Sequence, residues 1–443
     1  MAAPAAVVAA VTDGSGRRLP PDPELPGVAD LLADAPEVLA GFLAAQRWAL
    51  HDARPVQVLY RPGRSCDVRY QARARHPDGA LRALSLVVET RARPRTPSPP
   101  PASFGERYRL PNPVTGAGPY LAWVFPYDPS LPGLIDAASG PVVREALART
   151  GRRATAVAVQ PLRYRPRRRA VFHYLTLDRG RSDALFGKVL RPRKAEAILG
   201  AAPHLRGRRW SRRRLRVSLP LDDSTDGALL FTPLGGRSLR DLLLTGGSLP
   251  APERLAGVLD DLPRLVGNGS PPAPGSPKNP VRMAEHARTL LTRVVPKAAA
   301  DVHRAADAIV ERAQRDDTAL PDRLVHGDLY EAQVFVGEDY SIGLIDIDDL
   351  GPGDPVLDAA NFCAHLIALG ASVPEAWAPL VAYRELVRDA FLARLDVPPA
   401  ALAWREALAL LLLASGPFRV LEPNWPAEVG RRVKIVLALL DRD

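Results

Sequence analysis

Apolar residues follow a helical spacing in some parts of the chain and a strand-like pattern in others. The changes between the two patterns mark the boundaries of its parts. Residues 28–46 carry apolar side chains at the three-to-four-residue spacing of an amphipathic helix. Strand-like segments follow, in which "PVQVLYRP" and "CDVRYQARA" flank Gly63 as a hairpin and "ALSLVVET" supplies a third strand. From about residue 250 onward the helical period returns, most clearly in "VRMAEHARTLLTRVV" and "DVHRAADAIVERAQ". The pattern predicts an α+β fold with two lobes, the first rich in sheet and the second mostly helical.

One hairpin pattern occurs twice in the sheet-rich half. The segment "LYRPGRSCDVRY" (residues 59–70) aligns with "RYRPRRRAVFHY" (residues 163–174), and each is followed by another strand-like segment. The alignment matches Tyr70 with Tyr174. It indicates that an N-terminal subdomain is related to the middle of the chain; the alternative is chance similarity in a sequence rich in Arg and Pro.

These segments predict four parts of the chain. Residues 1–27 are rich in Pro, Ala and Gly without a period and are expected to be disordered. Residues 28–150 form a β-rich cap subdomain that contains a Pro-rich linker at 91–105. Residues 151–236 form a second sheet-bearing lobe, and residues 237–443 form the mostly helical lobe.

Composition and charge limit the class of protein. Hydrophobic residues make up 47% of the chain and charged residues 24%, which is typical of a globular protein. The net charge of +10 comes with many Arg and 46 Pro residues, a bias that a GC-rich genome also produces. The basic run "LRGRRWSRRRLRV" (residues 205–217) is more simply a solvated turn than a phosphate site. A nucleic-acid-associated protein stays a weaker alternative, because no DNA- or RNA-binding signature accompanies the Arg runs.

Several features bear on location. The N-terminal stretch lacks the basic region of a secretion signal, and no apolar run reaches the roughly 18 residues that span a bilayer. The run from Leu408 to Ala414 is predicted to be part of a buried helix. Two cysteines, Cys66 and Cys363, allow no disulfide framework. We therefore expect a cytoplasmic protein.

The chemistry is concentrated in "LVHGDLYEAQVFVGEDYSIGLIDIDD" (residues 324–349). Carboxylates this close raise each other's pKa unless a cation lies between them. Phosphoryl transfer needs a carboxylate that accepts a hydroxyl proton, oxygen ligands for Mg²⁺ and a fixed cation on the nucleotide phosphates. Asp328 and Gln333 lie on one short loop, and Asp346 ends an apolar strand that faces it. Lys188, near the end of the strand "ALFGKVL", supplies the cation, and Glu196 on the next helix is placed to hold its ammonium group.

Together these motifs resemble the aminoglycoside phosphotransferase/choline kinase family, which has a bilobal protein-kinase-like fold. The resemblance rests on "HGDL" at residues 326–329 with Gln333, on Ile345 and Asp346, and on "GDP" at residues 353–355 with Asp358. It covers roughly residue 157 to the C-terminus.

The resemblance implies a role for each candidate residue. Asp328 is the catalytic base, Gln333 and Asp346 hold Mg²⁺, and Lys188 contacts the α- and β-phosphates of ATP. The segment "FTPLGGRSL" (residues 231–239) resembles the hinge that receives adenine, with backbone donors and acceptors near Thr232 and Leu234.

Within the family, the chain resembles most the capped maltokinase-like branch. That branch shares Gln333, where most members carry Asn, and an N-terminal cap. The chain departs from it at Asp348 and Asp349, where an aromatic residue and Glu-Gly usually follow the metal Asp, and at Tyr330, where the branch has His. We therefore expect a maltokinase-like kinase without assigning maltose.

The resemblance implies an ATP-dependent kinase that acts on a hydroxyl of a sugar, amino-sugar or aminoglycoside-like molecule. The alternative is an inactive kinase fold used as a binding or regulatory module, against which Lys188, Asp328 and Asp346 argue together. The carboxylates suit a cationic amino-sugar. Three aromatic residues either stack on a sugar ring or belong to the core: Trp404, Phe418 and Trp425.

Other residues near the motifs have structural interpretations. His326 is expected to brace its loop rather than act as a base. Asp354 and Asp358 are expected to cap or anchor the following helix. Asp348 and Asp349 either contact the acceptor or are solvated.

Overall fold

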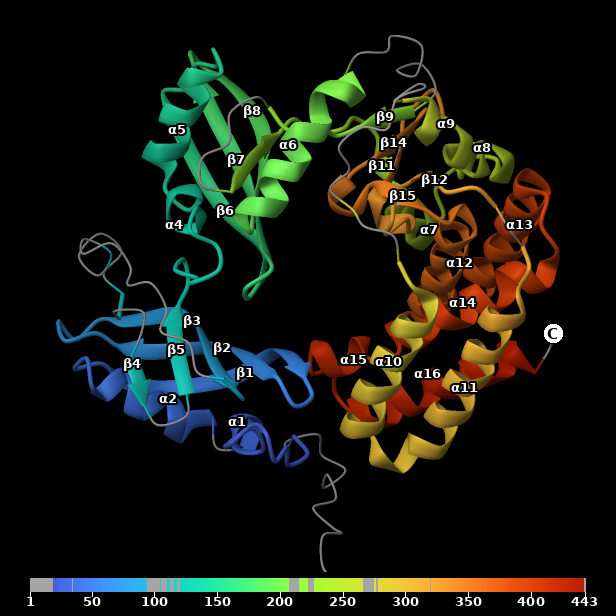
Figure 1. The fold of residues 1–443 in the computed structure, drawn as a ribbon. Helices are drawn as coiled ribbons and strands as arrows, with labels where there is room; N and C mark the ends of the chain where they lie inside the picture. Colours follow the sequence, from blue (N-terminus) through green and yellow to red (C-terminus); the bar gives the residue numbers. More distant parts are fainter. Residues whose placement is uncertain are drawn as a thin grey trace, which may run out of the picture. The chain divides into compact units, whose positions relative to one another are not determined.

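A computed structural model describes most of the chain (Figure 1). The described residues are 19–33, 35–93, 104, 110–111, 115–117, 120–206, 215–221, 227–265, 275, 278–318 and 320–441. The chain forms two compact units. The first comprises Met1–Pro129, Arg288–Val302 and Ser415–Arg431, and the second Ser130–Ala287, His303–Ala414 and Arg432–Asp443. The four predicted parts follow one another along the chain, whereas the first unit also takes in two segments of the C-terminal half.

The first unit contains a five-stranded antiparallel sheet with the strand order β1-β2-β3-β5-β4. Helix α2 packs on β1, and the short helix α1 precedes it. The elements are α1 (Asp30–Ala33), α2 (Ala35–Ala44), β1 (Ala49–Arg61), β2 (Ser65–Arg75), β3 (Leu81–Arg91), β4 (Thr115–Ala117) and β5 (Tyr120–Val124). The predicted Pro-rich linker lies mostly outside the described residues.

Residues 19–27 are ordered, so the predicted disordered segment 1–27 is wrong over this part; residues 1–18 lie outside the described chain. Leu19 and Leu25 are buried. The carboxylate of Asp22 accepts a hydrogen bond from the Tyr60 hydroxyl at 2.7 Å and from the Gly63 N–H at 2.8 Å. Asp22 thus ties the segment to the β1–β2 hairpin and two of its leucines are buried, although its composition resembles that of a disordered tail.

The second unit begins with a four-stranded antiparallel sheet with the order β10-β8-β7-β6. Helix α5 packs on β6, and α6 follows β8 and contacts it. The elements are α4 (Leu134–Ala137), α5 (Gly140–Arg149), β6 (Ala156–Arg165), β7 (Arg169–Asp178), β8 (Arg181–Leu190), α6 (Pro192–Arg206) and β10 (Ala228–Phe231). Most of the predicted basic turn at 205–217 lies outside the described residues.

The two sheets repeat one plan, which confirms the relation predicted from the hairpins. In each, two helices precede three antiparallel strands, as α1-α2-β1-β2-β3 and as α4-α5-β6-β7-β8. The first hairpin turn holds a left-handed residue at the matched position, Gly63 (φ 66°) or Arg167 (φ 60°). Tyr70 and Tyr174 are both buried, and their hydroxyls donate to backbone carbonyls of the preceding helical segment, at 2.5 and 2.8 Å.

The rest of the second unit carries small sheets between helices. One sheet has the order β11-β13-β14-β9, in which β14 and β9 are parallel, and another pairs β12 with β15. The strands are β9 (Leu215–Val217), β11 (Arg237–Ser238), β12 (Arg323–Val325), β13 (Val334–Val336), β14 (Ile342–Leu344) and β15 (Gly351–Gly353).

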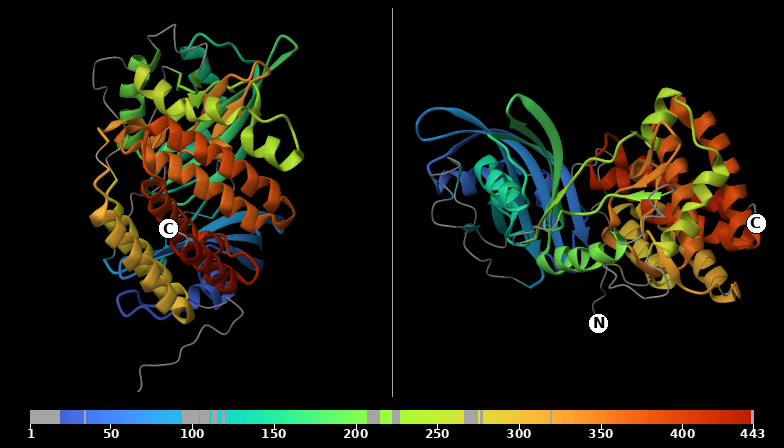
Figure 2. Two further views of the ribbon diagram at one scale, coloured as in Figure 1. Left: turned by 90° about the vertical axis from the view of Figure 1, so that its right-hand side faces the viewer. Right: turned by 90° about the horizontal axis from the view of Figure 1, so that it is seen from above.

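Helices dominate the chain after residue 238, as the periodicity predicted. They are α7 (Leu239–Thr245), α8 (Pro252–Ala256), α9 (Val258–Arg264), α10 (Pro280–Val294), α11 (Ala299–Arg315), α12 (Pro355–Ser372), α13 (Trp377–Leu395), α14 (Pro399–Leu413), α15 (Gly416–Arg419) and α16 (Trp425–Leu440). Short 3-10 turns lie at Pro296–Ala298, Glu331–Gln333, Ile347–Asp349 and Pro374–Ala376. Helix α12 packs against both α13 and α14, which appear orange to red in Figure 2.

Buried apolar side chains of the helical part form its core. Leu408, Leu410 and Leu411 on α14 are buried, which confirms the predicted buried helix. The stretch Pro399–Arg419 is long and apolar enough to cross a membrane, but 83% of its most apolar window is buried inside the protein. The three candidate sugar-stacking aromatics are buried as well, Trp404 in the second unit and Phe418 and Trp425 in the first, which favours a role in packing. Sheets followed by helices make this an α+β protein, as predicted.

Candidate active site

The loop His326–Asp328 is held in place by backbone hydrogen bonds. Asp358, on α12, accepts hydrogen bonds from the N–H groups of His326 at 2.7 Å and Gly327 at 2.9 Å. His326 is buried, and its Nε2 lies 2.9 Å from the carbonyl oxygen of Ile345. The predicted bracing role of His326 is therefore confirmed. Asp358 anchors this loop rather than its own helix, whereas Asp354 caps α12 as predicted, accepting from the Val356 N–H at 2.8 Å.

Gly327 has room for no other side chain. Its φ of 79° is left-handed, and a Cβ atom there would lie 2.3 Å from the carbonyl oxygen of Asp349. The glycine lets the loop pass close to residues 346–349, so that Asp328 approaches the second acidic segment.

Asp328 combines partial burial with an unusual pKa. Burial raises the pKa of its carboxyl group to about 6, against the opposing charges of Lys278 and His326; the carboxylates of Asp346 and Asp349 add to the increase. Lys278 lies beside the loop, where its ammonium group donates to the Gly327 carbonyl. A carboxylate with a pKa near the working pH is suited to accept and release a proton.

Asp346 follows β14 in a left-handed conformation, with φ 64° and ψ 47°. Asp is among the few residues that adopt this conformation readily. Two cations contact its carboxylate: the Lys188 ammonium group, and Arg169, whose Nη1 lies 2.8 Å from Oδ2 and 3.0 Å from Oδ1. Burial works against the ionised form, yet Lys188 and Arg169 hold the pKa of Asp346 well below its usual range.

Lys188 is buried on β8, as expected, but its partner differs from the predicted one. Its Nζ contacts Asp346 and lies 2.6 Å from Oδ1 of Asp348. Glu196 is exposed on α6, and no contact joins it to Lys188 in the described part of the chain. The predicted Lys188–Glu196 pair is therefore wrong, because α6 turns its apolar face, with Ala195 and Ile198, toward the core and leaves Glu196 outside.

Gln333 links the two acidic segments. Its Nε2 lies 3.4 Å from Oδ2 of Asp328 and 3.3 Å from Oδ2 of Asp346. The side chain is buried, and its Oε1 has no hydrogen-bond partner among the residues that the structure describes. A buried amide oxygen without a partner is costly unless something binds it.

The donor set fits Mg²⁺. Nowhere in the described ranges do three or more His, Cys, Asp or Glu side chains gather as a metal cage. Mg²⁺ does not require one, since it commonly takes one or two protein oxygens and fills its shell with phosphate oxygens and water. The unpartnered Gln333 oxygen and the ionised Asp346 are such a pair.

The predicted adenine hinge connects β10 to β11. Thr232 is exposed and Leu234 is half-buried against Gly343 of β14. Within the described chain, no hydrogen bond engages the backbone of either residue. Their N–H and C=O groups are therefore available to a planar ligand.

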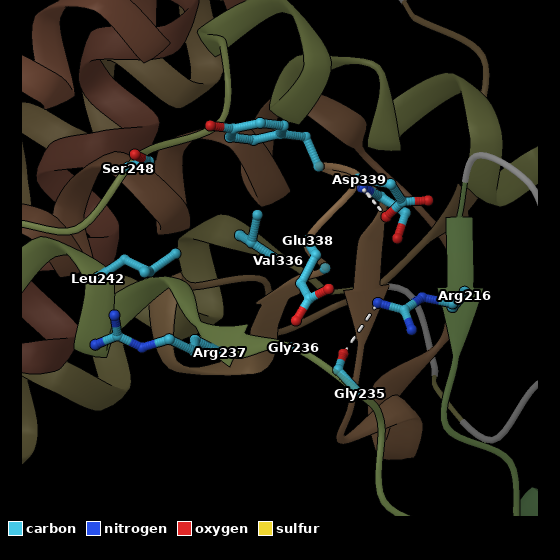
Figure 3. A pocket seen from close by; sticks show the side chains of 12 residues that line it. Arg216, Gly235, Gly236, Arg237, Leu242, Ser248, Val336, Glu338 and Asp339 are labelled. Atoms are coloured by element: carbon cyan, nitrogen blue, oxygen red, sulfur yellow. Dashed lines mark hydrogen bonds between the residues drawn. The ribbon is translucent and has the colours of Figure 1, made fainter.

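A cavity of about 1220 Å³ lies next to this connection but holds none of the predicted site residues (Figure 3). The guanidinium of Arg216 lines this cavity and donates to the Gly235 carbonyl at 3.0 Å. Glu338 and Asp339, in the turn between β13 and β14, line it as well. Charges of both signs line it, so it shows no preference for phosphate.

A smaller cavity of about 100 Å³ lies beside the loop His326–Asp328, with Gly327 on its wall. Polar groups on its wall include the side chains of Lys278, Asp322, Asp349, Asp354 and Asn361. Asp349 is bound by Lys194 at 2.8 Å, whereas Asp348 faces Lys188. The two residues left open by the sequence thus lie in different surroundings.

Sequence analysis missed three cations at the site: Arg169, Lys194 and Lys278. The signal for Arg169 was present, because it begins the strand next to Lys188 in the hairpin "RYRPRRRAVFHY". Lys278 had no such signal, since it reaches Gly327 from a segment 49 residues earlier.

Comparison with known families tests the predicted resemblance to the aminoglycoside phosphotransferase/choline kinase family. The sequence model of the phosphotransferase enzyme family (APH) matches residues 174–386. Over these residues the predicted resemblance to this family is confirmed. The matched segment includes Lys188, Asp328 and Asp346. The comparison does not reach the maltokinase-like branch, which stays a prediction. No curated protein matches the chain.

Solved structures similar to the chain include two aminoglycoside phosphotransferases. A thermostable mutant of APH(4)-Ia in complex with ADP and hygromycin B is 16% identical, with a TM-score of 0.43, and the match covers 67% of this chain and 98% of that one. APH(9)-Ia in complex with ADP and spectinomycin is 12% identical, with a TM-score of 0.46 and coverage of 68% and 98%. Choline kinase LicA from Streptococcus pneumoniae is 13% identical, with a TM-score of 0.45 and coverage of 68% and 99%.

Proposed function

We propose that the chain is an ATP-dependent kinase that phosphorylates a hydroxyl group of a sugar, amino-sugar or aminoglycoside-like molecule. One observation carries the proposal: Lys188, Asp328, Gln333 and Asp346 are joined contact by contact in a single cluster. A cation, a base and two oxygen ligands in contact are what phosphoryl transfer requires.

Asp328 acts as the base. Its carboxylate accepts the proton of the acceptor hydroxyl as that oxygen bonds to the γ-phosphorus and the bond to the bridging oxygen of ADP breaks. A pKa of about 6 leaves Asp328 mostly ionised at neutral pH and able to take the proton. Asp358 and Gly327 keep the loop rigid, so the carboxylate stays at the position where it is needed.

The other residues hold the nucleotide. Lys188 places a point charge on the phosphates. Gln333 and Asp346 would hold Mg²⁺, which supplies charge neutralisation on the phosphate oxygens when bound. The open backbone groups near Thr232 and Leu234 receive adenine.

The acceptor site we propose is the small cavity beside Gly327. Four aspartates, one asparagine and the ammonium group of Lys278 line it, and such groups bind hydroxyls; the carboxylates also bind protonated amines. Its lining supports a sugar or amino-sugar acceptor. The maltokinase-like branch and the cytoplasmic location are proposed from the sequence alone.

The first test measures nucleotide binding. Lys188→Ala is expected to weaken MgATP binding in calorimetry by about 10-fold or more, because a charge on the phosphates is lost. An acceptor is then sought by screening a library of sugars and amino-sugars for ATP consumption. Unchanged MgATP affinity in the variant would remove Lys188 from the site. A protein that binds MgATP but consumes none with any acceptor would favour the alternative, an inactive kinase fold.

A further inference from the structure

Arg169 and Lys188 lie on the same face of the second sheet. In the β7–β8 ladder Arg169 pairs with Leu190 and Val171 pairs with Lys188. Directly paired residues of antiparallel strands share a face, as do residues two apart on one strand. The two cations are therefore diagonal neighbours, and both reach Asp346.

The turn that precedes Arg169 offers little backbone to a phosphate. Protein kinases cover the phosphates at the corresponding hairpin with a Gly-rich loop. Here the turn reads Pro166-Arg167-Arg168, without glycine. Pro166 has no N–H group, and the Arg168 N–H already donates to the Arg165 carbonyl at 3.0 Å.

The guanidinium of Arg169 has donors to spare. Its Nη1 contacts both oxygens of Asp346, while Nε and Nη2 make no hydrogen bond to any residue that the structure describes. The side chain is 17% exposed, so a ligand at the site can reach it. A guanidinium can hold one carboxylate and a phosphate at the same time, because its five N–H groups point in fixed directions.

In the ligand-free protein the charges of Arg169 and Lys188 are balanced by two carboxylates, and a bound metal would change this balance. Two cations, Arg169 and Lys188, face two carboxylates, Asp346 and Asp348. If Asp346 turns to a bound metal, each cation needs a new anion. Phosphate oxygens supply it.

We infer that Arg169 is a second phosphate-binding residue, which replaces the backbone contacts of a Gly-rich loop with its side chain. The inference rests on the proposed ATP binding at this site. Arg169 binds the phosphate chain of the nucleotide and makes no contact with adenosine.

The experiment is calorimetric titration of ATP, ADP and adenosine, all at one saturating Mg²⁺ concentration, because Arg169 and Lys188 need a new anion when Asp346 binds the metal. Arg169→Gln is expected to weaken ATP and ADP binding by about 10- to 100-fold and to leave adenosine binding unchanged. Arg169→Lys keeps the charge but not the planar fork, and is expected to restore part of the loss. Arg181→Gln is the matched control, because Arg181 is an exposed arginine at the start of β8 and its loss changes the net charge equally.

A second comparison separates phosphate binding from simple neutralisation of Asp346. In an Asp346→Asn background, Arg169→Gln should still weaken ATP binding if the guanidinium contacts phosphate. No further loss in that background would overturn the inference, as would a loss shared by adenosine. If the unmodified protein fails to bind ATP, the proposed function falls and this inference with it; if it binds ATP and Arg169→Gln binds equally well, only this inference falls.

Discussion

The side-chain amide of Gln333 lies within hydrogen-bonding distance of Asp346, with 3.3 Å between Nε2 and Oδ2. The Ile345 N–H also donates to the backbone carbonyl of Gln333 at 3.1 Å, so backbone and side chain both join the two loops. Turning the amide about its last bond would present the Gln333 oxygen to the same place without moving either loop.

Gln333→Ala should raise the Mg²⁺ concentration needed for MgATP binding or turnover, because one of two oxygen ligands is removed. Gln333→Asn keeps the amide oxygen and should have a smaller effect, although its side chain is one methylene shorter. Titration of Mg²⁺ at fixed ATP measures both. Superimposable curves for the alanine variant and the unmodified protein would make Gln333 a loop residue only.

Replacing Asp328 or Asp346 by Asn should affect different steps: phosphoryl transfer in the first variant and MgATP binding in the second. Asp328→Asn keeps the shape of the side chain and removes the base, so MgATP should still bind while transfer falls about 10²- to 10⁴-fold. Asp346→Asn removes the charge at the metal, so MgATP affinity itself should fall. Calorimetry and ATP turnover, with slow hydrolysis by water as the first assay, separate the two effects. Full transfer activity in Asp328→Asn would disprove the proposed mechanism.

The same two variants should change the stability of the ligand-free protein in opposite directions. The folded-state pKa of Asp328 is about 6, above its ordinary 3.8, so ionisation is disfavoured in the fold and stability is lost as pH rises through this range. Asp328→Asn should therefore raise the melting temperature, by more at pH 8 than at pH 5. Asp346→Asn leaves Lys188 and the largely buried Arg169 with one carboxylate fewer. It should lower the melting temperature, with a loss of at most about 3–5 kcal/mol in the free energy of unfolding. Melting curves at both pH values check the signs, and equal shifts would contradict them.

The pH profile of turnover should follow Asp328. Because the base must be ionised, kcat/KM is expected to rise with pH and to level off above about 6. The residual turnover of Asp328→Asn should lack this rise. A flat profile for the unmodified protein between pH 5 and 8 would mean that another group takes the proton.

The sequence predicts the candidate site where its parts are local in the chain, and the structure brings these parts into contact. Asp328, Gln333 and Asp346 lie within 19 residues of one another, and the apolar runs around them fix their strands and loops. Lys188 was found because a lone Lys ends an apolar strand. The pattern could not show which carboxylate holds it, because that choice depends on the direction in which α6 presents Glu196.

Long-range contacts account for the rest. Arg169 meets Asp346 across 177 residues of chain, and no spacing rule connects them. The order of residues 19–27 likewise depends on Asp22 meeting Tyr60, 38 residues later. Composition predicts whether a segment can be disordered, but a few specific contacts decide whether it is.

The repeated plan of the two sheets has a consequence for descent and for ligand choice. Asp67 lies three residues before Tyr70 and pairs with Glu89 on β3. At the matched position of the second sheet, Val171 lies three residues before Tyr174 and pairs with Lys188 on β8. Glu89 is buried and paired with Arg91. A carboxylate at this position repels phosphate. If the two sheets arose by duplication, they kept the same architecture but differ in the sign of the charge at the position of Lys188. The chain therefore contains two sheets of the same plan, and only the second carries a cation at the position suited to bind nucleotide phosphates.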